Sequence, residues 1–167
     1  NIPTLIELNL SQNEIGPVSA KALFEYLCAP TCPLEKLILQ SADVDDFECQ
    51  NFIDAVKENR SLLELDLSSN LIGSAENLNT VYPDLITGGE AIADLLRNEN
   101  CKLRSLRLDW NMLRLDGAID LADSLATNQS LTYLNLSFNA LSTNGGTTIG
   151  ASILKNTTIE TLILEGN

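Results

Sequence analysis

The sequence predicts an α/β fold, a curved solenoid with parallel strands on its concave face and α-helices on its convex face. Three observations lead to this prediction. A leucine pattern returns along the whole of the 167 residues. Within each copy, apolar residues first alternate, as on one face of a strand, and then recur at helical spacing. Neither a lone strand nor a lone helix can bury its apolar side, so consecutive units must stack.

The repeating pattern is L-x-x-L-x-L-x-x-N, and its first copy runs from Leu5 to Asn13. The copies begin at residues 5, 34, 62, 103, 131 and 159, so the intervals are 29, 28, 41, 28 and 28 residues. The second copy has Ala42 in place of the asparagine. We expect a single domain over residues 1–167, with about five and a half repeats. Residues 1–4 match the tail of a preceding repeat and Asn167 closes an unfinished one, so we expect a fragment of a longer chain.

Each repeat predicts one strand followed by one helix. Leu8 and Leu10 alternate, as the buried face of a short strand requires. Ala20, Leu23 and Leu27 then follow at helical spacing. The recurring asparagine comes directly after the strand. We expect it to satisfy backbone polar groups in that turn, because its position is the same in every repeat.

These motifs resemble the leucine-rich repeat family over the full length of the chain. Units of 28–29 residues with a full helix are similar to its ribonuclease-inhibitor subfamily, since other types use about 20–24 residues. The resemblance implies protein ligands and no catalysis by the repeats themselves. Members of this subfamily include cytosolic immune receptors, actin-regulating proteins, ciliary scaffolds and the Ran GTPase-activating protein.

The composition narrows the possible functions. The chain has no histidine, which excludes histidine-based triads and zinc sites. Its 23 acidic and 10 basic residues give a net charge of −13, which disfavours nucleic acid and anionic membranes as partners. The same charge favours a basic or mixed-charge protein partner. The sequence shows neither a long apolar run nor a secretory leader, and we expect a cytoplasmic protein without cofactor or metal.

Cysteines and glycosylation sequons have simple interpretations. The cysteines lack the spacing of a zinc site, and we expect reduced thiols at Cys28, Cys32, Cys49 and Cys101. Sequons begin at Asn9, Asn59, Asn128, Asn135 and Asn156. They fall at equivalent points of the repeat, so we interpret them as products of the repeat and not as glycosylation sites.

The side chains beside the strand leucines point to the concave face, the usual binding surface of solenoids. In the fourth and fifth repeats these positions hold Arg107, Asp109, Trp110, Tyr133 and Phe138. Two adjacent strands lie about 5 Å apart, so these residues should form one patch. Exposed Trp, Tyr and Arg are typical of protein-binding hot spots. The alternative is that Trp110 and Phe138 only stack on each other beside the asparagine turn.

The longest interval contains an insert at residues 74–87, whose Val81 and Tyr82 are secondary binding candidates. The alternative is a neutral surface insertion, which costs little closure entropy.

Acidic residues gather at Asp43, Asp45, Asp46 and Glu48. They lack the spacing of a calcium loop, and Asp45 and Glu48 have the spacing of a helix capping box.

Three functions fit the sequence. The first is a protein-binding scaffold that uses its concave face. The second is regulation of a small GTPase, for which Arg114 is the one loose candidate for an inserted arginine. The third is an architectural segment whose aromatic patch is covered by a permanent neighbour.

Overall fold

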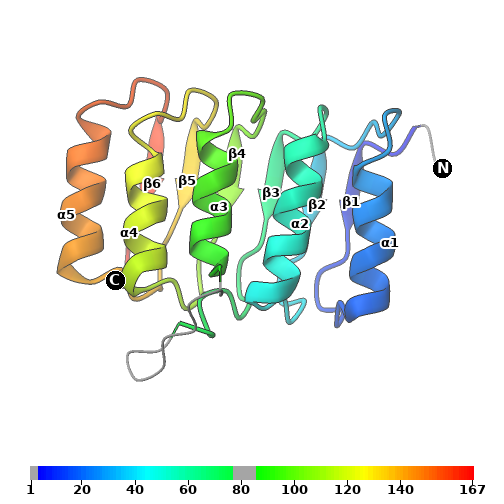
Figure 1. Ribbon diagram of the computed structural model, residues 1–167, viewed down its shortest axis with the longest axis horizontal. Coiled ribbons are helices and arrows are strands. Elements are labelled where there is room, and N and C mark those ends of the chain that lie inside the picture. Colours follow the sequence, from blue (N-terminus) through cyan, green and yellow to red (C-terminus); the bar gives the residue numbers. More distant parts are fainter. Residues whose placement is uncertain (1–3, 77–85) are drawn as a thin grey trace.

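The computed structural model describes residues 4–76 and 86–167. Short strands and helices alternate along these ranges (Figure 1). In chain order they are β1 (Glu7–Asn9), α1 (Pro17–Leu27), β2 (Lys36–Ile38), α2 (Asp46–Glu58), β3 (Glu64–Asp66), α3 (Gly88–Arg97), β4 (Ser105–Arg107), α4 (Leu115–Ser124), β5 (Tyr133–Asn135), α5 (Ser142–Ile153) and β6 (Thr161–Ile163). No helix in the described ranges is long and apolar enough to cross a membrane.

The strands form one parallel sheet in the order β1-β2-β3-β4-β5-β6, and the helices form a second layer on one side of it (Figure 1). The register places the strand leucines of successive repeats opposite one another. Leu65 pairs with Leu106 even though the longest interval separates them. The insert therefore leaves the register unchanged, and the predicted α/β leucine-rich solenoid is confirmed.

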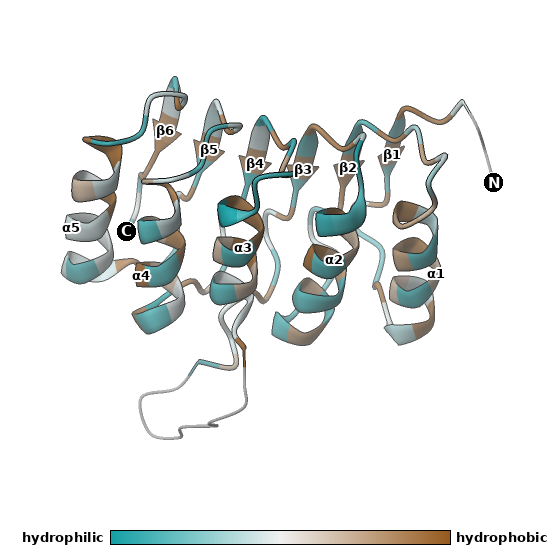
Figure 2. Ribbon diagram, turned by 45° about the horizontal axis from the view of Figure 1, so that its top comes forward, coloured by the Kyte–Doolittle hydropathy of each residue, from teal (hydrophilic) through white to brown (hydrophobic). Residues whose placement is uncertain are grey.

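The core lies between the sheet and the helices. Leu37, Leu65 and Leu106 from the strands are at most 2% exposed. Ile53 on α2 and Ile92 on α3 are fully buried against them. Figure 2 shows that the helices turn their hydrophobic sides toward the sheet and their hydrophilic sides outward. This is the burial that neither element achieves alone.

Asparagines in the turns after the strands form a ladder between successive repeats, and those of the third and fourth repeats are buried. The side-chain nitrogen of Asn70 donates to the carbonyl oxygens of Leu39 at 2.8 Å and Leu67 at 2.9 Å. Its side-chain oxygen accepts from the amides of Ala42 at 2.9 Å and Val44 at 3.1 Å. The expected role of these asparagines in the turn is confirmed. The structure adds that most of the bonds of Asn70 reach into the preceding repeat.

A second set of asparagines, at the ends of the helices, also joins neighbouring repeats by hydrogen bonds. Asn59 donates to the carbonyl oxygen of Leu27 and Asn128 to that of Leu96, both at 2.8 Å. Both side chains are buried. Glycosylation would attach to these nitrogens, which are already engaged inside the protein. A structural role thus accounts for the asparagine at these two sequons.

We expect Asn70→Ala to lower the free energy of unfolding by about 2–4 kcal/mol, because it leaves several buried backbone groups unsatisfied. The matched control is Asn13→Ala. Asn13 is exposed and bonds only to Leu10 and Ser11 in its own turn. Its loss should cost less than about 1 kcal/mol. Urea denaturation measures both, and equal losses would show that the bonds between repeats add nothing to stability.

Candidate functional site on the strand face

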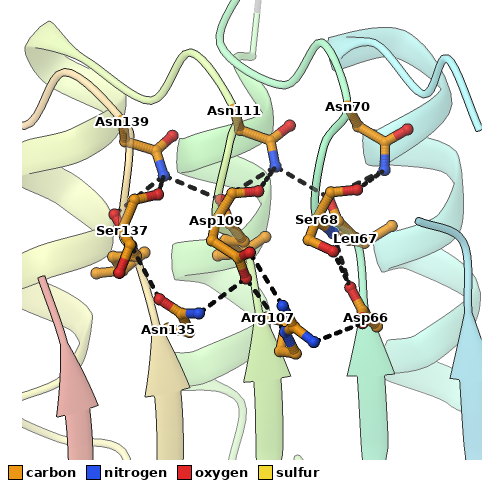
Figure 3. A network of polar contacts seen from close by, with 12 residues as sticks. Asp66, Leu67, Ser68, Asn70, Arg107, Asp109, Asn111, Asn135, Ser137 and Asn139 are labelled. Atoms are coloured by element: carbon orange, nitrogen blue, oxygen red, sulfur yellow. Dashed lines mark hydrogen bonds and ion pairs between the residues drawn. The ribbon is translucent and has the colours of Figure 1, made fainter. Parts of the chain in front are cut away.

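Arg107, on β4, is held by two carboxylates, one on the neighbouring strand and one in the turn after β4 (Figure 3). Its Nε and Nη2 donate to Oδ1 and Oδ2 of Asp109 at 3.2 and 3.0 Å. Its Nη1 lies 3.5 Å from Oδ2 of Asp66 on β3. Asp109 also accepts a 3.0 Å hydrogen bond from the amide of Asn135 on β5. The network spans three strands, so Arg107 is fixed in position before any partner arrives.

The strand face carries its positive charges between pairs of acids. The hydrogen bond that Arg107 donates to Asp109 is the main cause of its raised pKa, and the Asp66 charge adds to it. Lys36 on β2 has a similar place, with its Nζ 3.6 Å from Glu7 and 3.7 Å from Glu64. Each cation thus faces two carboxylates, so each group has a net negative charge. The face is acidic even where it displays basic residues.

Asp109 does not face outward as expected, because it is only 7% exposed. Its position in the repeat is occupied by Ser68 in the third repeat and Ser137 in the fifth, and both are also buried. In these three repeats the position lies beneath the surface beside the asparagine turn. Asp109 therefore acts on the face by orienting Arg107, and its own oxygens are used within the chain.

Trp110 and Phe138 stack, with ring centroids 4.2 Å apart and an angle of 15° between the rings. The expected stacking is thus present, and it still leaves Trp110 58% exposed. Both residues have left-handed backbone conformations, with φ of 58° and 52°. Bulky residues rarely adopt this conformation, which costs on the order of 1 kcal/mol or more. The position before the asparagine is left-handed in every described repeat, with Gly166 in the last one.

Tyr133 is half-buried at the start of β5, the strand next to that of Arg107. The structure therefore places Arg107 and Tyr133 on adjacent strands and stacks Trp110 on Phe138 in the turns that follow them. Asp66 and Asn135 were missed as parts of this group. Both occupy the same column as Arg107 in neighbouring repeats. Comparing that column across repeats would have found them.

The insert residues Val81 and Tyr82 lie outside the described residues. The described parts beside them are fixed by the buried Asp46. Its carboxylate accepts hydrogen bonds from the amides of Gly73 and Ala75, both at 2.8 Å, and of Gly88 at 2.6 Å. One acid of the predicted acidic cluster thus anchors both flanks of the insert.

The neighbouring acids cap α2 differently from a full capping box. Asp45 accepts from the amides of Phe47 and Glu48, as expected for the residue before a helix. The Glu48 carboxyl hydrogen-bonds to the Asp45 side chain, which raises the pKa of Glu48 and lowers that of Asp45. A reciprocal capping box forms instead at the start of α3, between Thr87 and Glu90.

Arg114 is engaged within the chain. Its guanidinium donates to the carbonyl oxygen of Glu76 and to that of Ser74. The Glu76 carboxylate in turn accepts from the amide of Gly117 at 3.1 Å. Arg114 therefore ties the insert to the start of α4.

The described residues contain no group of three or more acids or cysteines that could hold a metal ion. The four cysteines are free thiols. Cys49 is fully buried, and this burial raises its pKa.

The comparisons with known proteins identify the family. A family model described as leucine-rich repeat matches residues 1–24, 58–75, 99–122 and 127–150. The chain belongs to the leucine-rich repeat family. It is 32% identical over 145 residues to ribonuclease inhibitor of Sus scrofa, covering 87% of this chain and 29% of the relative. It is 33% identical over 142 residues to NACHT, LRR and PYD domains-containing protein 14 of Mus musculus, covering 85% of this chain and 13% of the relative. The resemblance to the ribonuclease-inhibitor type is confirmed.

Solved structures show the same fold. The tropomodulin C-terminal domain of Caenorhabditis elegans matches with a TM-score of 0.66 and 19% identity, over 92% of this chain and 85% of that one. A structure titled Leiomodin-1 Actin-Binding Site 2 matches with a TM-score of 0.68 and 20% identity, over 92% and 82%. This leucine-rich repeat chain spans less than a third of either curated relative above.

We expect Gly166→Ala to disturb the aromatic stack. A Cβ atom at this position would lie 2.4 Å from the Phe138 ring, and the φ of +71° is unfavourable for alanine. The emission of Trp110, the single tryptophan, should shift. Gly150→Ala on α5 is the control, because its Cβ meets nothing within 4 Å and alanine favours a helix. An unchanged emission in Gly166→Ala would show that Phe138 does not depend on this glycine.

We expect Asp46→Ala to cost about 2–4 kcal/mol, because it removes the acceptor of three backbone amides. Hydrogen exchange followed by NMR should speed up at Gly73, Ala75 and Gly88. Asp94→Ala is the control, because Asp94 is exposed and has one 3.4 Å contact with Lys57. Unchanged exchange at the three amides would contradict the anchoring role of Asp46.

Proposed function

We propose that this chain is a protein-binding module that holds a protein partner against its concave strand face. The observation that carries this proposal is the fixed Arg107 network beside the exposed Trp110 ring. Arginine, tryptophan and tyrosine are the residues most enriched in hot spots. A guanidinium already held by its neighbours loses little conformational entropy on binding, which favours affinity.

The charge of the face supports a basic or mixed-charge partner. Both cations on the strands are outnumbered by the acids that hold them, and the whole chain has a net charge of −13. Association with such a partner should slow as salt is added. The acidic surface likewise disfavours nucleic acid and anionic membranes.

The relatives support a protein-binding role in general terms. One is named for the inhibition of a ribonuclease, and a solved structure with the same fold is titled as an actin-binding site. For this chain we propose binding without catalysis, in the cytoplasm, where thiols stay reduced. Regulation of a small GTPase loses support because Arg114 is bonded to the insert.

The test is affinity capture from a lysate by the parent chain and by the triple variant Arg107→Ala, Trp110→Ala and Tyr133→Ala. We expect a protein captured by the parent to be lost by the variant, since the variant removes the large side chains of the face. Capture at increasing salt should weaken, because the interaction is partly electrostatic.

The matched control changes three exposed side chains of the helix layer, with Val18→Ala on α1, Phe47→Ala on α2 and Leu154→Ala directly after α5. Circular dichroism and thermal melting must first show that each variant stays folded. Equal capture by the parent and the strand-face variant would overturn the proposal.

A further inference from the structure

An exposed apolar strip runs along one edge of the solenoid, where the strands pass into the helices. Leu71 and Met112 directly follow the ladder asparagines of the third and fourth repeats, and each is 40% exposed. Trp110 precedes the same asparagine and is 58% exposed. Phe138 extends the strip into the next repeat through its stack on Trp110. Four large apolar side chains therefore share one edge.

The backbone joins this edge into a continuous surface. The amide of Leu71 donates to the carbonyl oxygen of Val44 at 2.9 Å, and that of Met112 donates to Ile72 at 2.8 Å. The amide of Ala140 continues the row, donating to Leu113 at 3.0 Å. The same backbone hydrogen bond thus recurs along the edge from one repeat to the next. Such an edge suits a partner segment that runs across several repeats.

Trp110 and Phe138 lie on this edge with a left-handed backbone conformation that is unfavourable for bulky residues. The left-handed position before the asparagine holds glutamine, serine, serine and glycine in the other described repeats, at Gln12, Ser41, Ser69 and Gly166. These residues are smaller or less rigid than tryptophan and phenylalanine. Strain retained at an exposed position points to a role outside folding.

The charge changes along the edge. In the first two repeats, the residues after the asparagine position are Glu14 and Asp43, and both are exposed acids. In the next two repeats the same position holds Leu71 and Met112. The edge is therefore acidic at one end and apolar along its middle.

We infer that the partner reaches over this edge with a segment that is basic at one end and apolar at the other. Its basic end lies on Glu14 and Asp43, and its apolar end covers Leu71, Met112 and Trp110. This inference rests on the proposed function, because it assumes a protein partner. It differs from the proposed function because it places part of the contact on the edge and not only on the strand face. Charge complementarity sets the direction in which the segment lies.

The experiment uses short tryptophan-free peptides and the emission of Trp110, the single tryptophan. The probe has a lysine-rich half followed by a leucine-rich half. One control peptide replaces lysine by glutamate, and another replaces leucine by serine. We expect a saturable blue shift with the probe, at an affinity at least about tenfold above both controls.

Matched variants locate the contact. Leu71→Ser with Met112→Ser should weaken binding of the probe at least about tenfold. Val18→Ser with Leu154→Ser removes apolar groups that are even more exposed, from α1 and the end of α5, and should leave binding unchanged. Glu14→Gln with Asp43→Asn should weaken binding and reduce its salt dependence, and asparagine tolerates the φ of 55° at residue 43.

The outcomes separate the two proposals. No saturable binding, equal binding of the glutamate peptide, or unchanged binding by the Leu71 and Met112 variant overturns the edge inference. If that variant still captures a lysate protein that Arg107→Ala with Tyr133→Ala has lost, the strand-face proposal stands alone. The opposite result is that the Leu71 and Met112 variant loses a lysate protein which the Arg107→Ala, Tyr133→Ala variant still captures. The edge is then the binding site, and the strand-face proposal is wrong.

Discussion

The hydrogen bonds of the buried ladder asparagines are the constraint on which the rest of this structure depends. Each turn after a strand leaves backbone amides and carbonyls inside the protein, where water cannot reach them. Asn70 and Asn111 satisfy these groups in their own turn and in the preceding one. An asparagine at a set distance from the strand leucines meets this need in every repeat but the second, which has Ala42 there. The number of residues between one turn and the next helix is left open, which is why the insert is tolerated.

The ladder also determines where functional side chains can stand. The residue before each asparagine is left-handed in the described repeats, so that its side chain leaves the strand row and comes to the edge. At most of these positions a small or polar residue adopts the left-handed conformation. At Trp110 and Phe138 the chain instead carries aromatic rings, which stack and keep one large apolar surface exposed. The same backbone feature thus serves folding and the proposed binding.

Acidic side chains in this protein act as internal anchors as well as surface charges. Asp109 and Asp66 hold Arg107, and Asp46 holds the flanks of the insert. Each anchor is buried or nearly buried, and each is matched by N–H donors at hydrogen-bond or ion-pair distance. Fixed donors and acceptors of this kind make a binding face rigid before it meets a partner, which lowers the entropy lost on association.

The sequence by itself determined the repeat, the order of strands and helices, the register of the sheet and the strands on which the candidate residues lie. These properties follow from a period in the apolar residues, and a period can be counted along the chain. Only the tertiary structure decided that Asp109 is buried, that Arg107 is compensated by two acids and that Arg114 is bonded to the insert. These facts depend on which donors and acceptors meet across neighbouring repeats. Arg114 and Glu76, for example, are 38 residues apart in the chain and are joined by a hydrogen bond. The period brings such residues to neighbouring repeats, but side-chain conformation and burial decide which of them pair.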